Sequence, residues 1–493
     1  MWSIDLGDFG APARGSGTGA VFARIAAAIS ADIRRGVLRA GDRLPSTRLL
    51  AEQLGVTRNT AVAAYDELAA QGWIATRGAA GTVVAAELPE RPVRRTVAAS
   101  ASTSMLRGLA RKPPFELDPV APLFTPFDTD ARVQLSVGIP DPRLFPKVAF
   151  ARAYRRALRS PAGTIALGYG DPLGTLRLRA AIAAMLRATR AIPATADNVM
   201  VTRGSQMAIE LAARALLRPG DVAAVEAFGY QPAWRSLESA GARLVGVPLD
   251  VAGLVVDALP PRARCVYTTP HHQYPTTVLL SPARRLALLE RARRDRFAII
   301  EDDYDHEYHF DGRPVAPLAS ADPAGAVLYV GTLSKILAPG LRLGYVVAPE
   351  LVIAALGHLR SSLDRHGDHV LELAVADLLE DGDIARHAAT SRRIYAARRD
   401  AFAHYLRRAL GSALAFALPA GGLTIWAHVA PDISIDRWRA RAAARGVAFV
   451  PGRLLALDRD RPPPAPFIRL AFGRYSEPEL AAAVDVLKRT LRA

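Results

Sequence analysis

Lysine is almost absent from a chain that is otherwise rich in positive charge. The 493 residues include 63 Lys and Arg side chains, and only four are lysines: Lys112, Lys147, Lys335 and Lys488. Where a generic positive charge is needed, the chain therefore uses Arg. Arg cannot lose its proton, whereas a Lys shielded from water can become a neutral nucleophile. Lys335 lies among small and apolar residues, which calls for a chemical role, whereas a lone Lys is more often a surface residue on a loop.

Disulfides, long apolar runs and an export signal are also lacking. The single cysteine, Cys265, cannot form an internal disulfide, which is typical of a reducing cytoplasm. Half of the residues are hydrophobic, but the apolar runs are short and interrupted, so we expect no membrane span. The first residues include Asp5 and Asp8 and no basic run followed by an apolar one, so no secretory signal is predicted. These absences favour a cytoplasmic protein.

The chain carries a large excess of positive charge and is too long for a single core. Its net charge is +16, which predicts a polyanionic partner. Residues 20–86 hold eight Arg against five acidic residues, so charge alone does not locate a surface for that partner. The length predicts two or three domains.

Three short helical patterns follow one another near the N-terminus. Apolar residues recur at helical spacing over residues 22–33. Ser46 and Gly55 are placed to cap a second helix, and Thr57 and Gly72 bracket a third. Two short helices joined by a glycine-containing turn are typical of a helix-turn-helix.

The strands that follow complete a winged helix. Trp73–Thr76 and Thr82–Ala85 flank a glycine-rich turn, which predicts a hairpin wing. The run GDRLPSTRLLAEQLGVTRNTAVAAYDELAAQGWI, which starts at Gly41, resembles the winged helix of the GntR family of bacterial regulators nearly position for position. We assign residues 20–86 to this domain and expect residues 1–19 to be disordered.

The GntR resemblance implies that the start of the third helix contacts double-stranded operator DNA. In the major groove, Arg grips guanine or phosphate and Asn can bind adenine. For any single Arg the alternative is a solvated helix face. The predicted DNA-binding residues are Arg48, Thr57, Arg58, Asn59 and Thr60, with Arg43 and Arg77 as phosphate contacts.

Residues 87–130 lose all periodicity and are rich in Pro, Ala, Ser and Arg, which predicts a linker of about 40 residues. Strand and helix patterns alternate after it, which is typical of an α/β sheet domain. The tail is expected to form a smaller α+β subdomain. The predicted strands are Val199–Val201, Val222–Val225, Arg243–Val247, Cys265–Thr268, Ala298–Glu301, Val327–Val330 and Tyr345–Ala348, followed in the tail by Leu423–His428 and Ile468–Phe472.

Several segments of residues 131–493 resemble the fold-type-I aminotransferases, which bind pyridoxal 5′-phosphate (PLP). The turn before a helix at Ser205 offers free N–H groups suited to a phosphate, and the resemblance makes it the phosphate cup, with Ser205 and Gln206. Tyr230 follows a predicted strand, and the resemblance implies that it stacks on the PLP ring, with an ordinary packed loop aromatic as the alternative. The resemblance further implies that Lys335 forms the Schiff base with PLP. Arg342 would bind the phosphate, helped by Thr332 or Ser334.

A predicted strand ends in the carboxylates Asp302 and Asp303, at the edge of the sheet where such folds build their sites. PLP needs a carboxylate on its pyridine nitrogen and benefits from a phenol near O3′. The aminotransferase resemblance implies that these are an Asp and a nearby Tyr, and matching its spacing to Lys335 assigns the roles to Asp302 and Tyr304. Asp303 is the rival, because strand alternation allows only one of the two to face inward.

Two further matches concern the dimer and the effector. Tyr169 lies in a segment that, in aminotransferases, often reaches the PLP phosphate of the neighbouring subunit, which implies a homodimer. Arg469 resembles the Arg that binds the α-carboxylate of a substrate, with a surface Arg as the alternative.

The sequence also departs from the aminotransferase pattern. Tyr274 stands where aminotransferases carry an Asn, which points away from efficient turnover. Position 232 is Pro, where the resemblance to a 4-aminobutyrate-responsive regulator implies an Arg that binds the distal carboxylate of the effector. The missing Arg argues against 4-aminobutyrate as effector. Four histidines flank the site and could contact the effector, or pack or face solvent as ordinary side chains: His271, His272, His306 and His309. No Cys/His metal spacing is present, so no metal ligand is predicted.

A GntR winged helix joined by a linker to an aminotransferase-like domain is the architecture of the MocR subfamily of PLP-dependent transcriptional regulators. That resemblance implies a dimeric regulator that senses an amine or amino acid, or PLP itself, through an aldimine on Lys335. One alternative is an active aminotransferase with a DNA-binding appendage. Another is a regulator whose large domain is a scaffold without cofactor.

Overall fold

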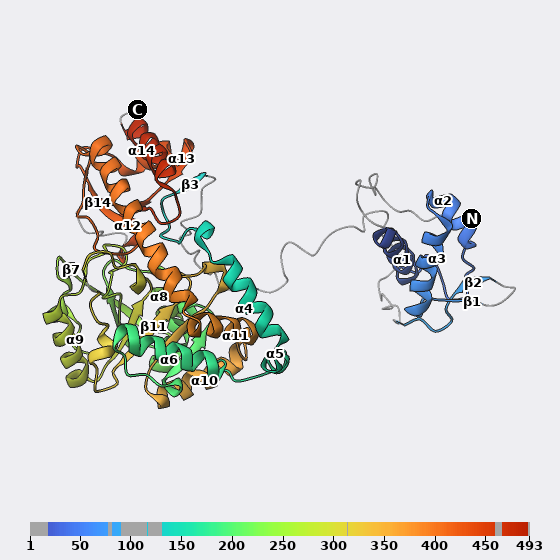
Figure 1. Cartoon of the computed structure of the whole chain (residues 1–493), viewed down its shortest axis with the longest axis horizontal. Coiled ribbons are helices and arrows are strands. Elements are labelled where there is room, and N and C mark those ends of the chain that lie inside the picture. Colours follow the sequence, from blue (N-terminus) through green and yellow to red (C-terminus); the bar gives the residue numbers. More distant parts are fainter. Residues whose placement is uncertain are drawn as a thin grey trace. The chain divides into compact units, whose positions relative to one another are not determined.

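The computed structural model of the chain divides into two compact units, Met1–Asp118 and Pro119–Ala493 (Figure 1). It describes residues 18–76, 81–89, 116, 131–312, 314–458 and 466–491. The predicted disordered residues 1–19 and the predicted linker lie almost wholly outside the described residues. In the described part of the chain, no helix is both long and apolar enough to cross a membrane.

The first unit contains the predicted three helices and hairpin. They are α1 (Thr18–Arg34), α2 (Thr47–Leu54), α3 (Arg58–Ala70), β1 (Ile74–Thr76) and β2 (Thr82–Val84). Ser46 caps α2 by accepting a hydrogen bond from the Leu49 N–H, and Gly55 ends it in the left-handed conformation. Apolar faces of all three helices meet in one core that includes Ile29, Leu50 and Leu68.

The second unit is built on a seven-stranded sheet with the order β4-β12-β11-β10-β9-β5-β6. The five strands from β11 to β6 are parallel, and β12 runs antiparallel to both β11 and β4. The sequence predicted all seven strands, though not this order. Their bounds are β4 Val199–Thr202, β5 Val222–Glu226, β6 Arg243–Val247, β9 Ala263–Thr268, β10 Ala298–Asp303, β11 Val327–Thr332 and β12 Gly344–Val347.

Helices cover both faces of this sheet. Because side chains alternate along a strand, Val199 and Val201 of β4 join one buried cluster and Met200 joins another. The first cluster packs against α4, α6 and α11, and the second packs against α7, α8 and α10. The helices of the sheet domain are α4 Lys147–Arg159, α5 Pro161–Ala166, α6 Leu176–Arg190, α7 Ser205–Leu216, α8 Gln231–Ser239, α9 Pro282–Asp295, α10 Glu350–Leu363 and α11 His369–Glu380.

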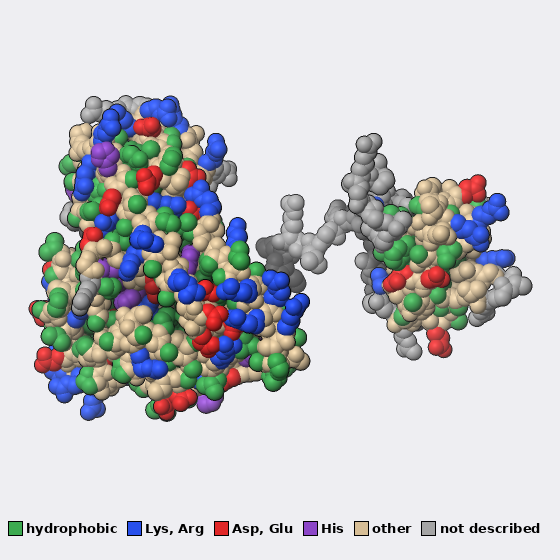
Figure 2. Space-filling model, in the orientation of Figure 1, with side chains coloured by type: hydrophobic (Ala, Val, Ile, Leu, Met, Phe, Trp, Pro, Cys, Tyr) green, Lys and Arg blue, Asp and Glu red, His purple; other side chains and the backbone are tan. Residues whose placement is uncertain are grey.

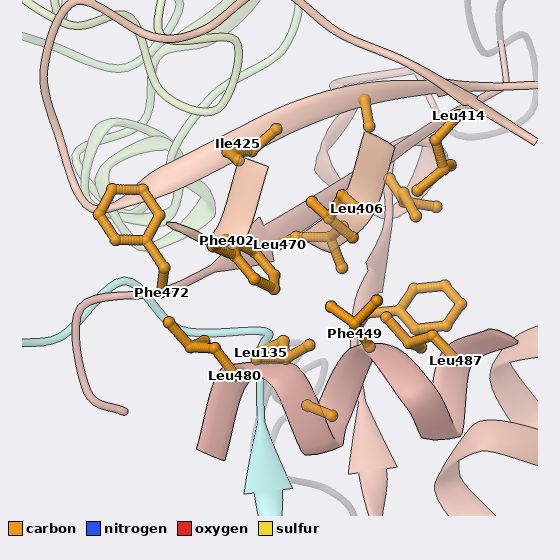
Figure 3. Close-up of a cluster of buried hydrophobic side chains, with 14 of the residues drawn as sticks. Leu135, Phe402, Leu406, Leu414, Ile425, Phe449, Leu470, Phe472, Leu480 and Leu487 are labelled. Atoms are coloured by element: carbon orange, nitrogen blue, oxygen red, sulfur yellow. The ribbon is translucent and has the colours of Figure 1, made fainter. Parts of the chain in front are cut away.

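A smaller subdomain follows, as predicted. Its antiparallel sheet has the order β13-β14-β17-β16, with β13 at Leu414–Ala415, β14 at Thr424–Val429, β16 at Val450–Pro451 and β17 at Phe467–Ala471. The helices are α12 (Asp383–Leu410), α13 (Ile435–Ala444) and α14 (Glu477–Leu491), and β15 (Val447–Ala448) pairs with β3 (Val133–Gln134). Figure 3 shows Leu135, the residue after β3, packed with Phe402, Leu470 and Leu480 in the hydrophobic core of this subdomain.

Salt bridges join several charged side chains of α4, α6 and α11. Arg156 contacts Asp377 and Asp381, and Arg177 contacts Asp377 and Glu380. These residues lie on α4, α6 and α11 or just after α11, where Figure 2 shows basic and acidic side chains interleaved. The net charge of +16 is therefore not gathered on this face.

Candidate functional site

A cavity of about 410 Å³ lies where the carboxyl ends of the sheet strands meet the small subdomain. Loops that follow parallel strands converge at this edge of an α/β sheet, which is where such folds build sites. Its lining includes nine of the predicted site residues: Ser205, Tyr230, Asp302, Tyr304, Thr332, Ser334, Lys335, Arg342 and Arg469.

Lys335 is partly buried in this cavity and donates a hydrogen bond from Nζ to the Gly138 carbonyl oxygen, at 2.7 Å. Burial lowers the pKa of its amine to about 8, and the positive charge of Arg469 contributes in the same direction. The amine is therefore much easier to deprotonate than that of an ordinary Lys.

Strand alternation separates the two candidate carboxylates, as expected. Asp302 lines the cavity and accepts a hydrogen bond from the Tyr267 hydroxyl at 2.8 Å. Its other oxygen, Oδ1, is buried and has no hydrogen-bond partner among the described residues. Burial raises the pKa of Asp302 to about 7.

Asp303 faces the other way and does not line the cavity. Its Oδ2 accepts hydrogen bonds from the Tyr329 hydroxyl, at 2.7 Å, and from His306 Nδ1, at 2.9 Å. Burial opposes its ionisation, but the charge and hydrogen bond of His306, together with the charge of Arg190, outweigh burial and hold the pKa of Asp303 well below its usual range. Asp302 is thus the carboxylate that faces the cavity.

The turn before α7 has the geometry of an anion cup. Gly204 has φ of +75°, and a Cβ there would lie 3.0 Å from an Arg342 guanidinium nitrogen. Ser205 is the first residue of α7, has no side-chain cap before it and lines the cavity, so the positive end of the helix dipole lies at the cavity edge. Arg342 itself is exposed and donates to the Arg203 carbonyl oxygen at 3.2 Å.

The remaining predicted residues have other partners. Gln206 lies outside the cavity and donates to the Pro232 carbonyl oxygen and to the Ser236 hydroxyl. Tyr304 lines the cavity but donates its hydroxyl to the His272 carbonyl oxygen at 2.9 Å. Tyr169 is 84% exposed and lies outside the lining of this cavity, with the Arg365 guanidinium 5.1 Å from its ring centroid.

Arg469 and Tyr274 form one wall of the cavity. The Arg469 guanidinium lies 4.5 Å from the centroid of the Tyr274 ring and donates to the Ser136 carbonyl oxygen at 2.9 Å. Arg469 is 5% exposed, and its Nε has no hydrogen-bond partner in the described part of the chain. Arg469 is therefore a buried cavity residue and not a surface Arg.

The sequence did not reveal two parts of the lining. One is the segment Ser136–Ile139, whose Gly138 has no room for a Cβ because it would lie 2.8 Å from Thr424. The other is Thr269, which donates its hydroxyl to Glu226 at 2.9 Å and so holds the loop that carries Tyr274. The only sequence signal for the segment Ser136–Ile139 was a glycine between apolar residues.

None of the four flanking histidines lines the cavity within the described residues; they lie behind it. His271, His272 and His309 each bring a potential metal-ligand atom within 4.8 Å of the other two, as do His271, Asp303 and His306. Burial lowers the pKa of His271 to about 2. The sequence predicted no metal ligand because these residues lack a recognised spacing.

The predicted DNA-binding residues lie at the start of α3 and on α2. Arg48, Thr57, Arg58 and Asn59 are exposed, whereas Thr60 is 8% exposed. The Thr57 hydroxyl accepts from the Thr60 N–H and is 2.8 Å from the Thr60 hydroxyl. The burial and hydrogen bonds of Thr60 are therefore explained by the helix cap, without a contact to DNA. Arg43 is exposed and pairs with Val83 beside the wing, and Arg77 lies outside the described residues.

The family patterns "Bacterial regulatory proteins, gntR family" and "Aminotransferase class I and II" match residues 22–84 and 132–487. The chain is 35% identical to the probable rhizopine catabolism regulatory protein MocR of Rhizobium meliloti, covering 86% of this chain and 84% of that one. It is 33% identical to the HTH-type transcriptional regulator TauR of Rhodobacter capsulatus, covering 97% of both chains. The chain belongs to the MocR-type GntR regulators. It therefore combines a DNA-binding helix-turn-helix with a fold-type-I aminotransferase domain.

A solved structure resembles the large unit of this MocR-type regulator. It is LysN, the α-aminoadipate aminotransferase of Thermus thermophilus, in complex with N-(5′-phosphopyridoxyl)-L-leucine. The TM-score is 0.66 at 29% identity, and the match covers 73% of this chain and 91% of LysN. The aminotransferase fold predicted for this part of the chain is thus confirmed.

Proposed function

We propose that this regulator binds PLP in the cavity around Lys335 and that an amine or amino acid bound there controls its affinity for operator DNA. Bound PLP supplies an aldehyde that bonds reversibly with amines and a ring that absorbs visible light. The single observation that carries the proposal concerns Asp302, which lines the cavity and whose buried Oδ1 has no partner among the described residues. A pyridine N–H is a group that would satisfy it.

The other cavity residues fit the rest of the cofactor. Ser205 and Arg342 form a cup for its phosphate, Tyr230 offers an aromatic face, and Lys335 offers an amine of lowered pKa. LysN, with a related fold, holds a phosphopyridoxyl amino acid. These residues would orient the cofactor and exclude water from it.

Arg469 would bind the carboxylate of an amino-acid effector. It is buried, lines the cavity and has one N–H without a partner in the described chain. A guanidinium in this setting binds a carboxylate well, because both partners are shielded from water. An effector held by β17 of the small subdomain and by Lys335 of the large one would bias the packing of the two, and a switch needs such differential binding.

We also propose that the regulator is a homodimer. Tyr169 is a large aromatic side chain that is 84% exposed, which suits a contact with a second copy better than with water. Two winged helices in one dimer would bind paired operator half-sites. The cofactor, the effector and the dimer together define the proposed sensor. We place this sensor in the cytoplasm, with the DNA that it binds.

The test is to add PLP to the purified chain, reduce it with borohydride, and locate the phosphopyridoxyl group by mass spectrometry. We expect it on Lys335 and on no other lysine, and we expect none in Lys335→Ala. Operator affinity is then measured with PLP and a panel of amines. Affinity that no amine changes would exclude the sensor function, and release of a keto acid would identify an active aminotransferase.

A further inference from the structure

Four buried histidines form a cluster behind the cavity. His271 and His272 follow β9, while His306 and His309 lie at either end of the short 3-10 helix His306–Tyr308. Their exposed fractions are between 1% and 6%. The ring centroid of His271 is 4.3 Å from that of His272 and 4.6 Å from that of His306. Such a cluster is costly to bury unless its polar atoms are satisfied.

His271 is not satisfied. Both of its ring nitrogens are buried, and neither has a hydrogen-bond partner among the residues that the structure describes. An imidazole always carries at least one N–H and, when neutral, one lone pair, so burial without partners costs free energy twice. A group with this cost calls for an occupant that the protein atoms do not provide.

The ring nitrogens around His271 are arranged as ligands of a single ion. His272 Nε2 and His309 Nδ1 are 3.2 Å apart, and His271 brings a ring nitrogen within 4.8 Å of both. In a tetrahedral zinc site with Zn–N bonds of about 2.0–2.1 Å, ligand nitrogens are about 3.3 Å apart. The His272–His309 pair already has this spacing.

The Asp305 carboxylate orients His272, one of the three proposed ligands. His272 Nδ1 donates to Asp305 Oδ1 at 2.8 Å, and Asp305 is 3% exposed. The Nδ1–H tautomer leaves the lone pair on Nε2, the atom that faces His309. Metal-bound histidines are commonly held by a carboxylate in this way.

The backbone at Gly421 packs closely against His272. A Cβ on Gly421 would lie 2.2 Å from Nε2, and Gly421 pairs with His309 through an isolated β-bridge. Only glycine fits at this position, so the backbone packs directly against the imidazole of His272 and shields the cluster.

The second group, His271 with Asp303 and His306, is less suited to an ion. Its Asp303 and His306 already bond to each other, and Tyr329 occupies the same carboxylate oxygen. An ion there would compete with the two hydrogen bonds at Asp303 Oδ2, although Oδ1 has no partner among the described residues. In the first group the ion would replace one hydrogen bond, between His272 Nε2 and His309 Nδ1, and His271 has none to lose.

We propose that His271, His272 and His309 bind a divalent transition-metal ion, with zinc as the best match to three imidazoles and a water molecule completing the tetrahedron. The ion would replace the hydrogen bonds that His271 lacks. Tyr304 donates to the His272 carbonyl oxygen and lines the cavity, so the ion would also stiffen the cavity wall.

The test uses the full chain without an affinity tag, freed of metal by dialysis against a chelator and without added PLP, so its outcome is independent of the proposed function. Zinc is titrated by calorimetry, and we expect one ion per chain. Cobalt is titrated by visible absorption, where a tetrahedral site with imidazole ligands has strong bands. Absence of zinc binding by the wild-type chain would overturn the proposal.

Matched variants separate the two histidine groups. His271→Gln and His309→Gln should weaken zinc binding at least tenfold, whereas His306→Gln should bind zinc as the wild type does. Loss of binding in His306→Gln with retention in His309→Gln would assign the ion to the other group and contradict the proposal. X-ray absorption of the zinc-loaded wild type needs no variant: three imidazoles are expected, and fewer would contradict the site.

Discussion

Lys335 of the large sheet domain donates its Nζ hydrogen bond to the carbonyl oxygen of Gly138, 197 residues earlier in the chain. Gly138 has no room for a side chain because the small subdomain packs against it through Thr424 and Arg469. The amine therefore lies at the junction of the two parts of the unit, where any group bound to it contacts both. This position is what makes Lys335 suited to a sensor.

The reactivity of Lys335 should depend on pH with a midpoint near 8. Burial and the charge of Arg469 favour the neutral amine, and only the neutral amine attacks an aldehyde. We expect the yield of PLP trapped by borohydride in short incubations to rise through pH 8 and then to level off.

Arg469→Gln checks the electrostatic part of this explanation. Removing a nearby positive charge raises the pKa of an amine, so the midpoint should move to higher pH. An unchanged midpoint would mean that burial alone lowers the pKa of Lys335.

Asp302→Asn should weaken PLP binding by about tenfold or more, because a charged hydrogen bond to the pyridine nitrogen would be lost. Folding should be retained, since the Asn has the same shape and Asp302 accepts only one hydrogen bond within the described residues. PLP binding is measured by fluorescence quenching, and folding by circular dichroism.

Asp303→Asn is the matched control, and we expect it to lower stability and to leave PLP binding largely intact. Asp303 bonds to Tyr329 and His306 inside the protein, so its replacement should lower the free energy of unfolding by about 3–5 kcal/mol. Chemical denaturation followed by fluorescence measures this loss. If Asp303→Asn instead released PLP from an equally stable protein, the assignment of Asp302 would be wrong.

Arg58→Ala should weaken specific operator binding by about 1–3 kcal/mol. Arg58 is exposed at the first position of α3, where a recognition helix enters the major groove. Titration of operator DNA by fluorescence anisotropy measures the loss. Arg293→Ala, an exposed Arg on α9 of the other unit, is the control and should leave affinity unchanged.

Thr57 should matter to the helix even without DNA. Its hydroxyl caps α3, so Thr57→Ala should destabilise the winged helix by about 1 kcal/mol, whereas Thr57→Ser should not. Thermal unfolding followed by circular dichroism measures the effect. Equal stability of the Ala variant and the wild type would leave DNA contact as the only role for this side chain.

The local elements of both units could be predicted from the sequence. Caps such as Ser46 and Thr57 set helix starts through hydrogen bonds to residues three positions away, which a sequence pattern contains. The apolar strands predicted the sheet, and the rarity of lysine indicated Lys335. Alternation along β10 also predicted that only one of Asp302 and Asp303 faces inward.

The tertiary structure decided which residues meet. The sheet order placed Asp302 over the cavity and Asp303 against His306, a choice that alternation alone left open. The histidine cluster joins two segments more than thirty residues apart, and the cavity joins Gly138 to Lys335. These contacts depend on the pairing of distant strands and on the packing of one subdomain against another. Local periodicity carries no record of such long-range contacts, whereas it does determine where helices and strands begin and end.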